Sequence, residues 1–151
     1  MPEIEYVEDR MESEELLERL CPPVRNWFKD KFPDFTEPQK VAIPRILNGE
    51  HLLLCSPTGS GKTLTAFLTI IDDLVRRSLD GSLPDAVQCV YISPIKALAN
   101  DIEKNLMGPL GEIKERYLPS RAKEIKVGLR TGDTPQSEGE KMLRKPPHIL
   151  I

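Results

Sequence analysis

Residues 51–63 read HLLLCSPTGSGKT, and this stretch decides the fold. Its first part is an apolar run of strand length, which is typical of a strand buried on both faces of a sheet. A turn rich in glycine follows, and apolar residues at helical spacing then predict an amphipathic helix over residues 62–78. A strand, a glycine-rich turn and a helix in this order favour a loop that binds phosphate.

The chemistry of phosphate binding explains the residue types of this turn. Gly59 and Gly61 allow backbone φ values that other residues resist, so several N–H groups can converge on phosphate oxygens. The N-terminus of the following helix adds its positive partial charge. We therefore predict that nucleotide phosphates bind to six consecutive residues, Thr58, Gly59, Ser60, Gly61, Lys62 and Thr63.

Two side chains of this loop are candidates for a direct part in catalysis. Lys62 can reach the β- and γ-phosphates, and the hydroxyl of Thr63 is the candidate ligand for Mg²⁺. A lysine in the first turn of a helix faces positive partial charge, which is unfavourable unless an anion lies there. Ser56 stands where the usual pattern has glycine, but that position closes the turn rather than contacting phosphate.

The rest of the chain predicts helices that alternate with strands. Such alternation indicates βαβ units and an α/β fold in which helices cover both faces of a parallel sheet. Pro44 is expected to kink or divide its helix, and Asn48-Gly49 to end it. We predict helices over 13–21, 23–32, 37–48, 62–78, 95–107, 109–118 and 135–144, and strands over 51–56, 87–93, 125–130 and 148–151.

The segment FTEPQ, residues 35–39, has two interpretations. Thr36 is a candidate N-cap, and Gln39 three residues later completes the pattern of a capping box. The segment also resembles the Q motif of superfamily 2 helicases, in which a glutamine reads the edge of adenine. This resemblance implies that Gln39 selects ATP over GTP, because a side-chain amide can both donate to adenine and accept from it. The alternative is that Gln39 only caps the helix.

Two later segments resemble the motifs with which such helicases hold a nucleic-acid backbone. YISPIKALANDI (91–102) resembles motif Ia, and RTGDT (130–134) resembles motif Ib. Contacts of this kind go to sugar and phosphate and are independent of base sequence, as a translocating motor requires. The resemblance implies that eight residues contact nucleic acid: Pro94, Lys96, Ala97, Asn100, Arg130, Thr131, Gly132 and Asp133.

Together these motifs resemble the large helicase-related (Lhr) type of superfamily 2 helicase over residues 35–151. SPTGSGKTLTAFLTIIDDL (56–74) and YISPIKALANDIEKNL (91–106) carry most of the resemblance. It implies a RecA-like P-loop NTPase domain in an ATP-dependent enzyme, with Mg²⁺ as cofactor, that moves along single-stranded DNA and unwinds duplexes, including RNA:DNA hybrids. Residues 1–34 are then expected to be a helical extension in front of the first RecA-like domain.

The resemblance also implies parts of a helicase that the sequence does not contain. No DExH or DEAD sequence follows residue 63, and the apolar run 148–151 ends without a turn. The domain is therefore expected to be truncated on its C-terminal side, without the second RecA-like domain that carries the arginine finger. We predict that the chain binds ATP weakly and hydrolyses it undetectably, whereas a full-length parent is an active helicase.

Three other kinds of protein share the phosphate loop. A DEAD-box RNA helicase also carries a Q motif and GSGKT, although SPIKALAND differs from the PTREL-type motif Ia that is usual there. A non-catalytic module with a structural or vestigial P-loop is the second alternative. A metabolic kinase is the third, but the sequence offers no candidate acceptor site.

Composition limits the location and the partners. The formal net charge of −3 gives no bulk argument for nucleic-acid binding. Cys21, Cys55 and Cys89 form no CxxC pair, which argues against a disulfide framework or a zinc site and favours the reducing cytoplasm. No apolar run approaches the ~20 residues that cross a bilayer, so we expect no membrane contact. Single-stranded DNA or a DNA-containing duplex is the expected partner, with RNA as a further possibility.

Overall fold

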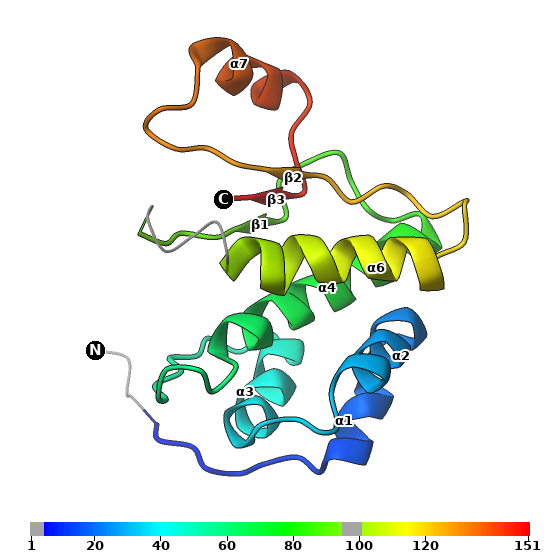
Figure 1. Ribbon diagram of the computed structural model, residues 1–151, viewed down its shortest axis with the longest axis vertical. Helices are drawn as coiled ribbons and strands as arrows, with labels where there is room; N and C mark the ends of the chain where they lie inside the picture. Colours follow the sequence, from blue (N-terminus) through cyan, green and yellow to red (C-terminus); the bar gives the residue numbers. More distant parts are fainter. Residues whose placement is uncertain (1–4, 95–100) are drawn as a thin grey trace.

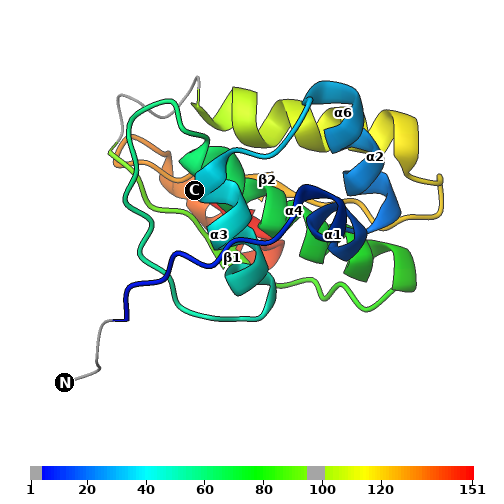
Figure 2. The ribbon, with the colours of Figure 1, turned by 90° about the horizontal axis from the view of Figure 1, so that it is seen from below.

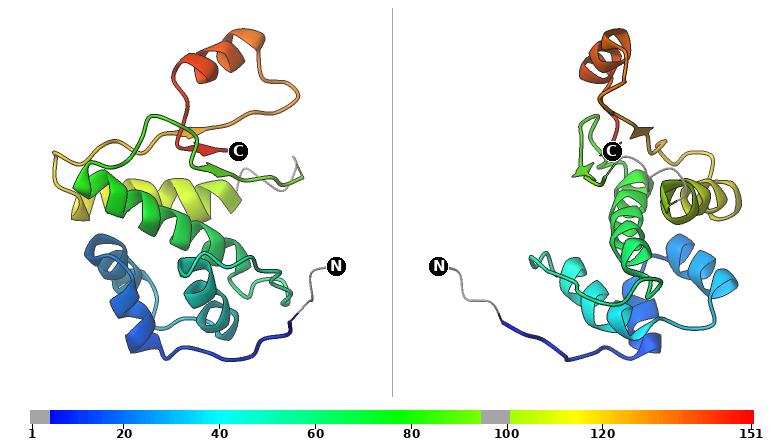
Figure 3. Two further views of the ribbon diagram at one scale, coloured as in Figure 1. Left: turned by 180° about the vertical axis from the view of Figure 1, so that it is seen from behind. Right: turned by 60° about the vertical axis from the view of Figure 1, so that its left-hand side comes forward.

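The computed structural model describes residues 5–94 and 101–151. In this part of the chain, a small sheet lies over a layer formed by α4 (Lys62–Asp80) and α6 (Gly108–Tyr117) (Figure 1). Three further helices, each shorter than α4, lie beneath that layer, and the view from behind (Figure 3) shows the same stacking. Figure 2 shows the molecule from below, from the side of these three helices. They are α1 (Ser13–Arg19), α2 (Pro22–Lys31) and α3 (Glu37–Leu47).

The sheet is parallel throughout, with the strand order β1-β3-β2. The central strand is the last one in the chain, and its Ile149 pairs with Cys89 on one side and Val127 on the other. The three strands are β1 (Cys89–Val90), β2 (Val127–Gly128) and β3 (Ile149–Leu150). This arrangement confirms the predicted α/β fold with parallel strands.

The helix α4 lies at the centre of the core. It begins and ends at glycines in the left-handed region, with φ of 89° at Gly61 and 79° at Gly81, which only glycine adopts without strain. Phe67 is fully buried on this helix, and α4 packs against α2, α3 and the π-helix η2 (Glu103–Met107). The helix predicted over 62–78 is confirmed and runs two residues further.

A buried carboxylate ties the first two helices to α4. Asp72 is 1% exposed, accepts the backbone N–H of Cys21 at 2.6 Å, and pairs with Arg76 at 2.7 Å. The guanidinium of Arg76 also donates to the carbonyl oxygen of Arg19 at the end of α1. Burial and the charge of Asp72 raise the pKa of the Cys21 thiol to about 12. The helices α1 and α2 therefore share one core with α4.

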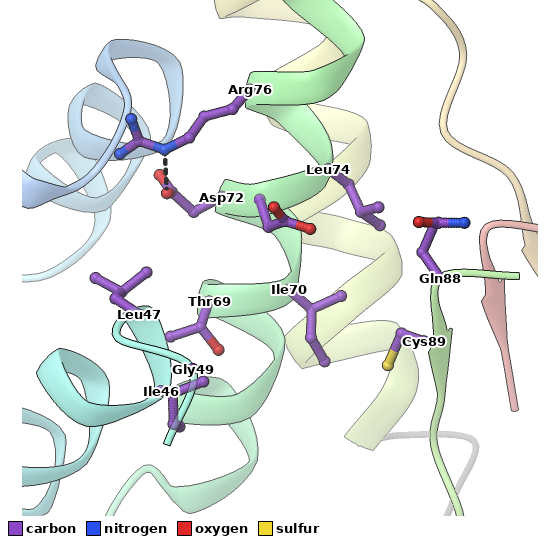
Figure 4. A pocket seen from close by; sticks show the side chains of 11 residues that line it. Ile46, Leu47, Gly49, Thr69, Ile70, Asp72, Leu74, Arg76, Gln88 and Cys89 are labelled. Carbon is purple, nitrogen blue, oxygen red and sulfur yellow. Dashed lines mark hydrogen bonds and ion pairs between the residues drawn. The ribbon is translucent and has the colours of Figure 1, made fainter. Parts of the chain in front are cut away.

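The prediction of a strand directly before the phosphate loop is wrong. Residues 51–56 form no strand in the described chain, and Leu53 is 83% exposed. A cavity of about 300 Å³ separates residues 50–54 from the first turns of α4. A second cavity, of about 430 Å³, opens between α4, the end of α3, Cys89 of β1 and the preceding Gln88 (Figure 4). The apolar run consequently has no neighbouring strand to complete a hydrogen-bond ladder.

Several other expectations need correction. Of the two outcomes expected at Pro44, the division does not occur, since α3 continues to Leu47, and the kink stays a prediction. Asn48-Gly49 ends the helix as predicted, with φ of 79° at Gly49. The three predicted strands that do form have only two residues each in the ladder. Among the described residues, helices cover one face of the sheet and not the two that were expected; Val90 is 58% exposed and α7 (Gln136–Arg144) has no buried residue.

The two helices predicted over 95–107 and 109–118 are continuous where the structure describes them. Residues 101–117 form one helix, and the π-helical turn η2 lies within it. None of the described helices combines the length and the apolarity that spanning a membrane requires.

Candidate nucleotide-binding site

The loop before α4 has the two left-handed glycines on which the predicted phosphate site depends. Gly59 and Gly61 both have positive φ, at 81° and 89°, and Ser60 N–H donates to the carbonyl oxygen of Pro57 at 3.3 Å. The hydroxyls of Ser56 and Ser60 share a hydrogen bond across the base of the turn. The predicted residues 58–63 thus lie together at the N-terminus of a long helix, where an anion is favoured.

The side chain of Lys62 folds back over this loop. Its ammonium group donates to the carbonyl oxygens of Ser56 and of Pro57, the latter at 2.8 Å. These two carbonyl oxygens hold the ammonium group at the loop and offset its repulsion from the positive end of α4.

The hydroxyl of Thr63 fits the part of a magnesium ligand. Thr63 is half-buried and makes no side-chain hydrogen bond with any described residue, whereas Thr65 on the next turn donates to the carbonyl of Gly61 at 2.9 Å. The described residues contain no cluster of three or more His, Cys, Asp or Glu that could hold a metal. A magnesium ion here would rest on Thr63 and on the nucleotide phosphates.

The FTEPQ segment contacts the phosphate loop directly. Gln39 is 3% exposed; its Oε1 accepts the Thr36 N–H at 2.9 Å, and its Nε2 donates to the carbonyl of Gly61 at 3.5 Å. The hydroxyl of Thr36 donates to the carbonyl of Ser60 at 2.8 Å. The capping interaction of Gln39 is thus confirmed, and the same side chain lies against the loop. Its contact with adenine stays a prediction.

A cavity of about 510 Å³ lies beside this contact. Five segments line it: α2, the FTEPQ region with the residues just before it, the phosphate loop, the first turn of α4, and the helix 101–117. Sequence reasoning missed most of its wall, because no motif links these segments. The residues found only by the structure are Trp27, Lys31, Phe32, Asp34, Leu64, Glu103, Lys104, Asn105, Gly108, Pro109 and Glu112.

Ion pairs hold part of the wall of this cavity. Glu112 accepts from the indole Nε1 of Trp27 at 2.6 Å and from Lys31 at 2.8 Å, and these contacts hold its pKa below the usual range. Asp34 pairs with Lys40 at 3.1 Å. The aromatic side chain of Phe32, 37% exposed, lies edge-on to Trp27 with ring centroids 5.8 Å apart. The cavity thus combines an aromatic side with polar groups.

The predicted nucleic-acid segments meet at one end of the sheet. A shallow cavity of about 240 Å³ is lined by Ser93 from the first segment and by Arg130 and Thr131 from the second. Pro94, Gly132 and Asp133 are exposed nearby in the chain. The other three predicted contacts, Lys96, Ala97 and Asn100, lie outside the described residues.

A parallel α/β sheet and a loop of left-handed glycines opening a central helix define a P-loop nucleotide-binding domain. The family model described as DEAD/DEAH box helicase matches residues 36–151. The chain belongs to this family.

Its relatives confirm the resemblance to the Lhr type. The chain is 47% identical to the ATP-dependent helicase Lhr-Core of Methanocaldococcus jannaschii over 100% of its own length and 18% of that protein. The identity to Lhr-Core of Methanothermobacter thermautotrophicus is 55%, over 87% of the chain and 15% of the relative. The chain therefore spans less than a fifth of the length of these relatives.

Solved structures agree with the fold. The helicase Lhr of Mycobacterium smegmatis, bound to ssDNA and AMP-PNP, matches with a TM-score of 0.75 and 42% identity, over 90% of this chain and 17% of that one. A yeast DEAD-box splicing factor matches with a TM-score of 0.71 at 21% identity, over 95% of this chain and 33% of its own, which supports the fold alone.

Proposed function

We propose that this chain is the nucleotide-binding N-terminal part of an ATP-dependent DNA helicase. The observation that carries the proposal is the contact between FTEPQ and the phosphate loop, in which Thr36 bonds to Ser60 and Gln39 to Gly61. It brings the predicted adenine reader to the predicted phosphate site, as one bound nucleotide requires. The ATP-dependent Lhr relatives support ATP as the ligand.

In this proposal the phosphates of ATP lie on the N–H groups of residues 58–63. Lys62 leaves the loop carbonyls and neutralises the β- and γ-phosphates, and Thr63 holds Mg²⁺, which offsets further phosphate charge. Gln39 accepts from and donates to the adenine edge. The sequence supplies no DExH or DEAD carboxylate for the metal, so the 151-residue chain binds ATP weakly and does not hydrolyse it measurably.

The proposed partner is single-stranded DNA or a DNA-containing duplex, held through Pro94, Lys96, Ala97, Asn100 and Arg130–Asp133. The meeting of Ser93, Arg130 and Thr131 at one cavity supports a shared backbone-binding edge. The Mycobacterium smegmatis relative was solved with ssDNA. An RNA substrate of the DEAD-box kind is the second candidate, and the ssDNA bound to the Mycobacterium smegmatis relative favours DNA.

We further propose that residues 1–34 are an extension to a RecA-like domain over 35–151, and that the protein works in the cytoplasm. The family model begins at residue 36, which supports this division. Cys21, Cys55 and Cys89 are all free, which suits a reducing compartment.

Titration of ATP with Mg²⁺ into the purified chain tests the proposal. Lys62→Ala is expected to abolish binding, because it removes the loop cation. Lys114→Ala is the matched control, since that lysine makes only an exposed pair with Glu124. Binding that survives in Lys62→Ala would favour the non-catalytic alternative, with a structural loop.

A turnover assay tests the predicted lack of hydrolysis. The chain is incubated with ATP, Mg²⁺ and single-stranded DNA, and released phosphate is measured. Turnover that DNA stimulates clearly would refute this part of the proposal. The same assay on a full-length relative, with DNA and RNA compared as activators, separates the two helicase candidates.

A further inference from the structure

The helix that follows the first nucleic-acid segment contains a π-helical turn. In η2, the N–H of Gly108 donates to the carbonyl oxygen of Glu103, five residues earlier, instead of four as in an α-helix. Normal α-helix precedes this turn at residues 101–102 and follows it in α6. Single π-turns inside α-helices are rare and occur frequently at functional sites.

Gly108 makes room for this turn. A Cβ added to Gly108 would lie 3.0 Å from the carbonyl oxygen of Glu103, the acceptor of the π-type bond. A Cβ added to Gly111, one turn further along α6, would meet nothing within 4 Å. A side chain at Gly108 would therefore require the Glu103 carbonyl to move by a few tenths of an ångström, whereas one at Gly111 would require no movement.

The π-turn forms one wall of the cavity beside the phosphate loop. Lys104 and Asn105 line it together with Gln39, Gly59 and Gly61. An extra residue in a helical turn shifts the preceding residues around the axis by about 100° relative to an uninterrupted α-helix. The π-turn consequently determines which residues of the helix face the cavity.

Lys104 differs from Lys31 and Asp34, which line the same cavity, in having no ion pair among the described residues. Lys31 is paired with Glu112, and Asp34 with Lys40. Lys104 is exposed and has no ion-pair partner among the residues that the structure describes. Its ammonium group is the one cation of the described cavity wall that is available to a ligand.

We propose that Lys104 is a nucleotide-binding residue and that Gly108 positions it through the π-turn. This rests on the proposed function, in which the phosphates lie on residues 58–63 and adenine lies at Gln39. Lys104 lines the cavity that Gln39, Gly59 and Gly61 also line, so it faces the part of the nucleotide between adenine and the phosphates. Its ammonium donates to the α-phosphate and the ribose oxygens.

Substitution of Lys104 tests the binding role. Lys104→Ala is expected to lower the affinity for ATP about tenfold, the usual effect of losing one hydrogen bond to a charged group. Lys104→Arg should restore most of it, and Lys114→Ala should bind like the unsubstituted chain. Tripolyphosphate, which lacks ribose and adenine, should lose less affinity than ATP. An ATP affinity of Lys104→Ala within twofold of the unsubstituted chain would overturn the proposal.

Substitution of the two glycines tests the positioning role. Gly108→Ala is expected to lower ATP affinity, and Gly111→Ala to leave it unchanged, with circular dichroism confirming that both variants fold. If Gly108 acts through Lys104, the double variant with Lys104→Ala loses no more affinity than Lys104→Ala alone. Additive losses would overturn the positioning role. Failure of the unsubstituted chain to bind ATP would instead contradict the proposed function.

Discussion

The hydroxyl of Thr36 donates a hydrogen bond of 2.8 Å to the backbone carbonyl oxygen of Ser60. This bond joins the first residue before α3 to the middle of the phosphate loop, 24 residues later in the chain. A loop that must present converging N–H groups gains from having its carbonyls held away from the anion. Thr36 therefore supports the site from outside it.

Thr36→Val should weaken both the loop and the start of α3. We expect a loss of about 1 kcal/mol in the free energy of unfolding, the usual effect of removing an N-cap hydroxyl, measured by urea denaturation. ATP affinity should fall severalfold because the Ser60 carbonyl is released. Thr36→Ser, which keeps the hydroxyl, is the control. Equal behaviour of the two variants would contradict a role for the bond.

The two loop glycines should differ in their tolerance of alanine. Both have positive φ, but a Cβ on Gly61 would lie 2.7 Å from Nε2 of Gln39, whereas one on Gly59 meets nothing within 4 Å. Gly61→Ala combines backbone strain with a clash against a buried side chain, and Gly59→Ala has only the strain. Thermal denaturation should show the larger loss for Gly61→Ala. The opposite order would argue against this loop geometry.

The sequence was a good guide where structure depends on local hydrogen bonds. The helix α4, its glycine ends and the cap at Thr36 all follow from residues within one turn of each other. The run 51–56 was predicted as a strand and is not one, because a strand satisfies its backbone only through a neighbouring strand. Its leucines predict that the run is buried, but they do not specify which strand it pairs with. The described chain leaves Leu53 83% exposed.

The residues of the candidate site were likewise predicted only where they belong to contiguous motifs. Its loop and Gln39 were found from contiguous motifs. Phe32 and Lys104 were not, since they reach the cavity only through the packing of α2 and η2 around α4. Gly108 lies between the two predicted helices, 95–107 and 109–118, and the π-turn that joins them depends on a carbonyl position that no residue type reveals.

Asp72 and Asp73 form a matched pair for testing the core. Each pairs with an arginine four residues later, but the Asp72 side chain is 1% exposed and that of Asp73 58%. Asp72→Ala leaves the Cys21 N–H without its acceptor, so we expect a loss of about 2 kcal/mol or more. Asp73→Ala should cost less than about 0.5 kcal/mol. Midpoints of urea denaturation give the comparison, and similar losses would contradict the buried link.

His148 should make the stability depend on pH. It is fully buried, and its Nδ1 accepts the Lys126 N–H at 2.9 Å. Burial, then the charges of Lys123 and Lys126, lower its pKa, although Asp85 opposes this. In the unfolded chain, where its pKa is about 6.5, His148 therefore binds a proton more readily than in the folded chain. The contribution of neutral His148 to stability is complete above that pH.

The free energy of unfolding should consequently fall as pH drops below about 6.5, by up to about 1.4 kcal/mol per unit, until the folded-state pKa is reached. Urea denaturation between pH 7.5 and 5, a range set by the reference pKa, measures the slope. His148→Asn, which keeps an acceptor for the Lys126 N–H, should flatten it. Exposed His51 replaced by Gln is the control. A slope unchanged in His148→Asn would rule out this cause.

Exposed apolar side chains should make the isolated chain associate. Leu53 is 83% and Ile92 89% exposed, and β1 is an edge strand of the sheet that the described residues form. Surfaces of this kind favour aggregation. Leu53→Lys with Ile92→Lys should raise the monomer fraction in light scattering, and Tyr6→Lys, a 92% exposed position in the N-terminal segment, should do less. Equal monomer fractions in all variants would contradict this cause.

The ammonium group of Lys62 is bonded to the carbonyl oxygens of Ser56 and Pro57, so an anion has to displace these two bonds to reach it. In the proposed function, a polyphosphate replaces them with anionic oxygens and brings further negative charges that the helix N-terminus also attracts. A small monoanion such as acetate offers only one charge for the same exchange. We therefore expect acetate to compete poorly with ATP for the loop.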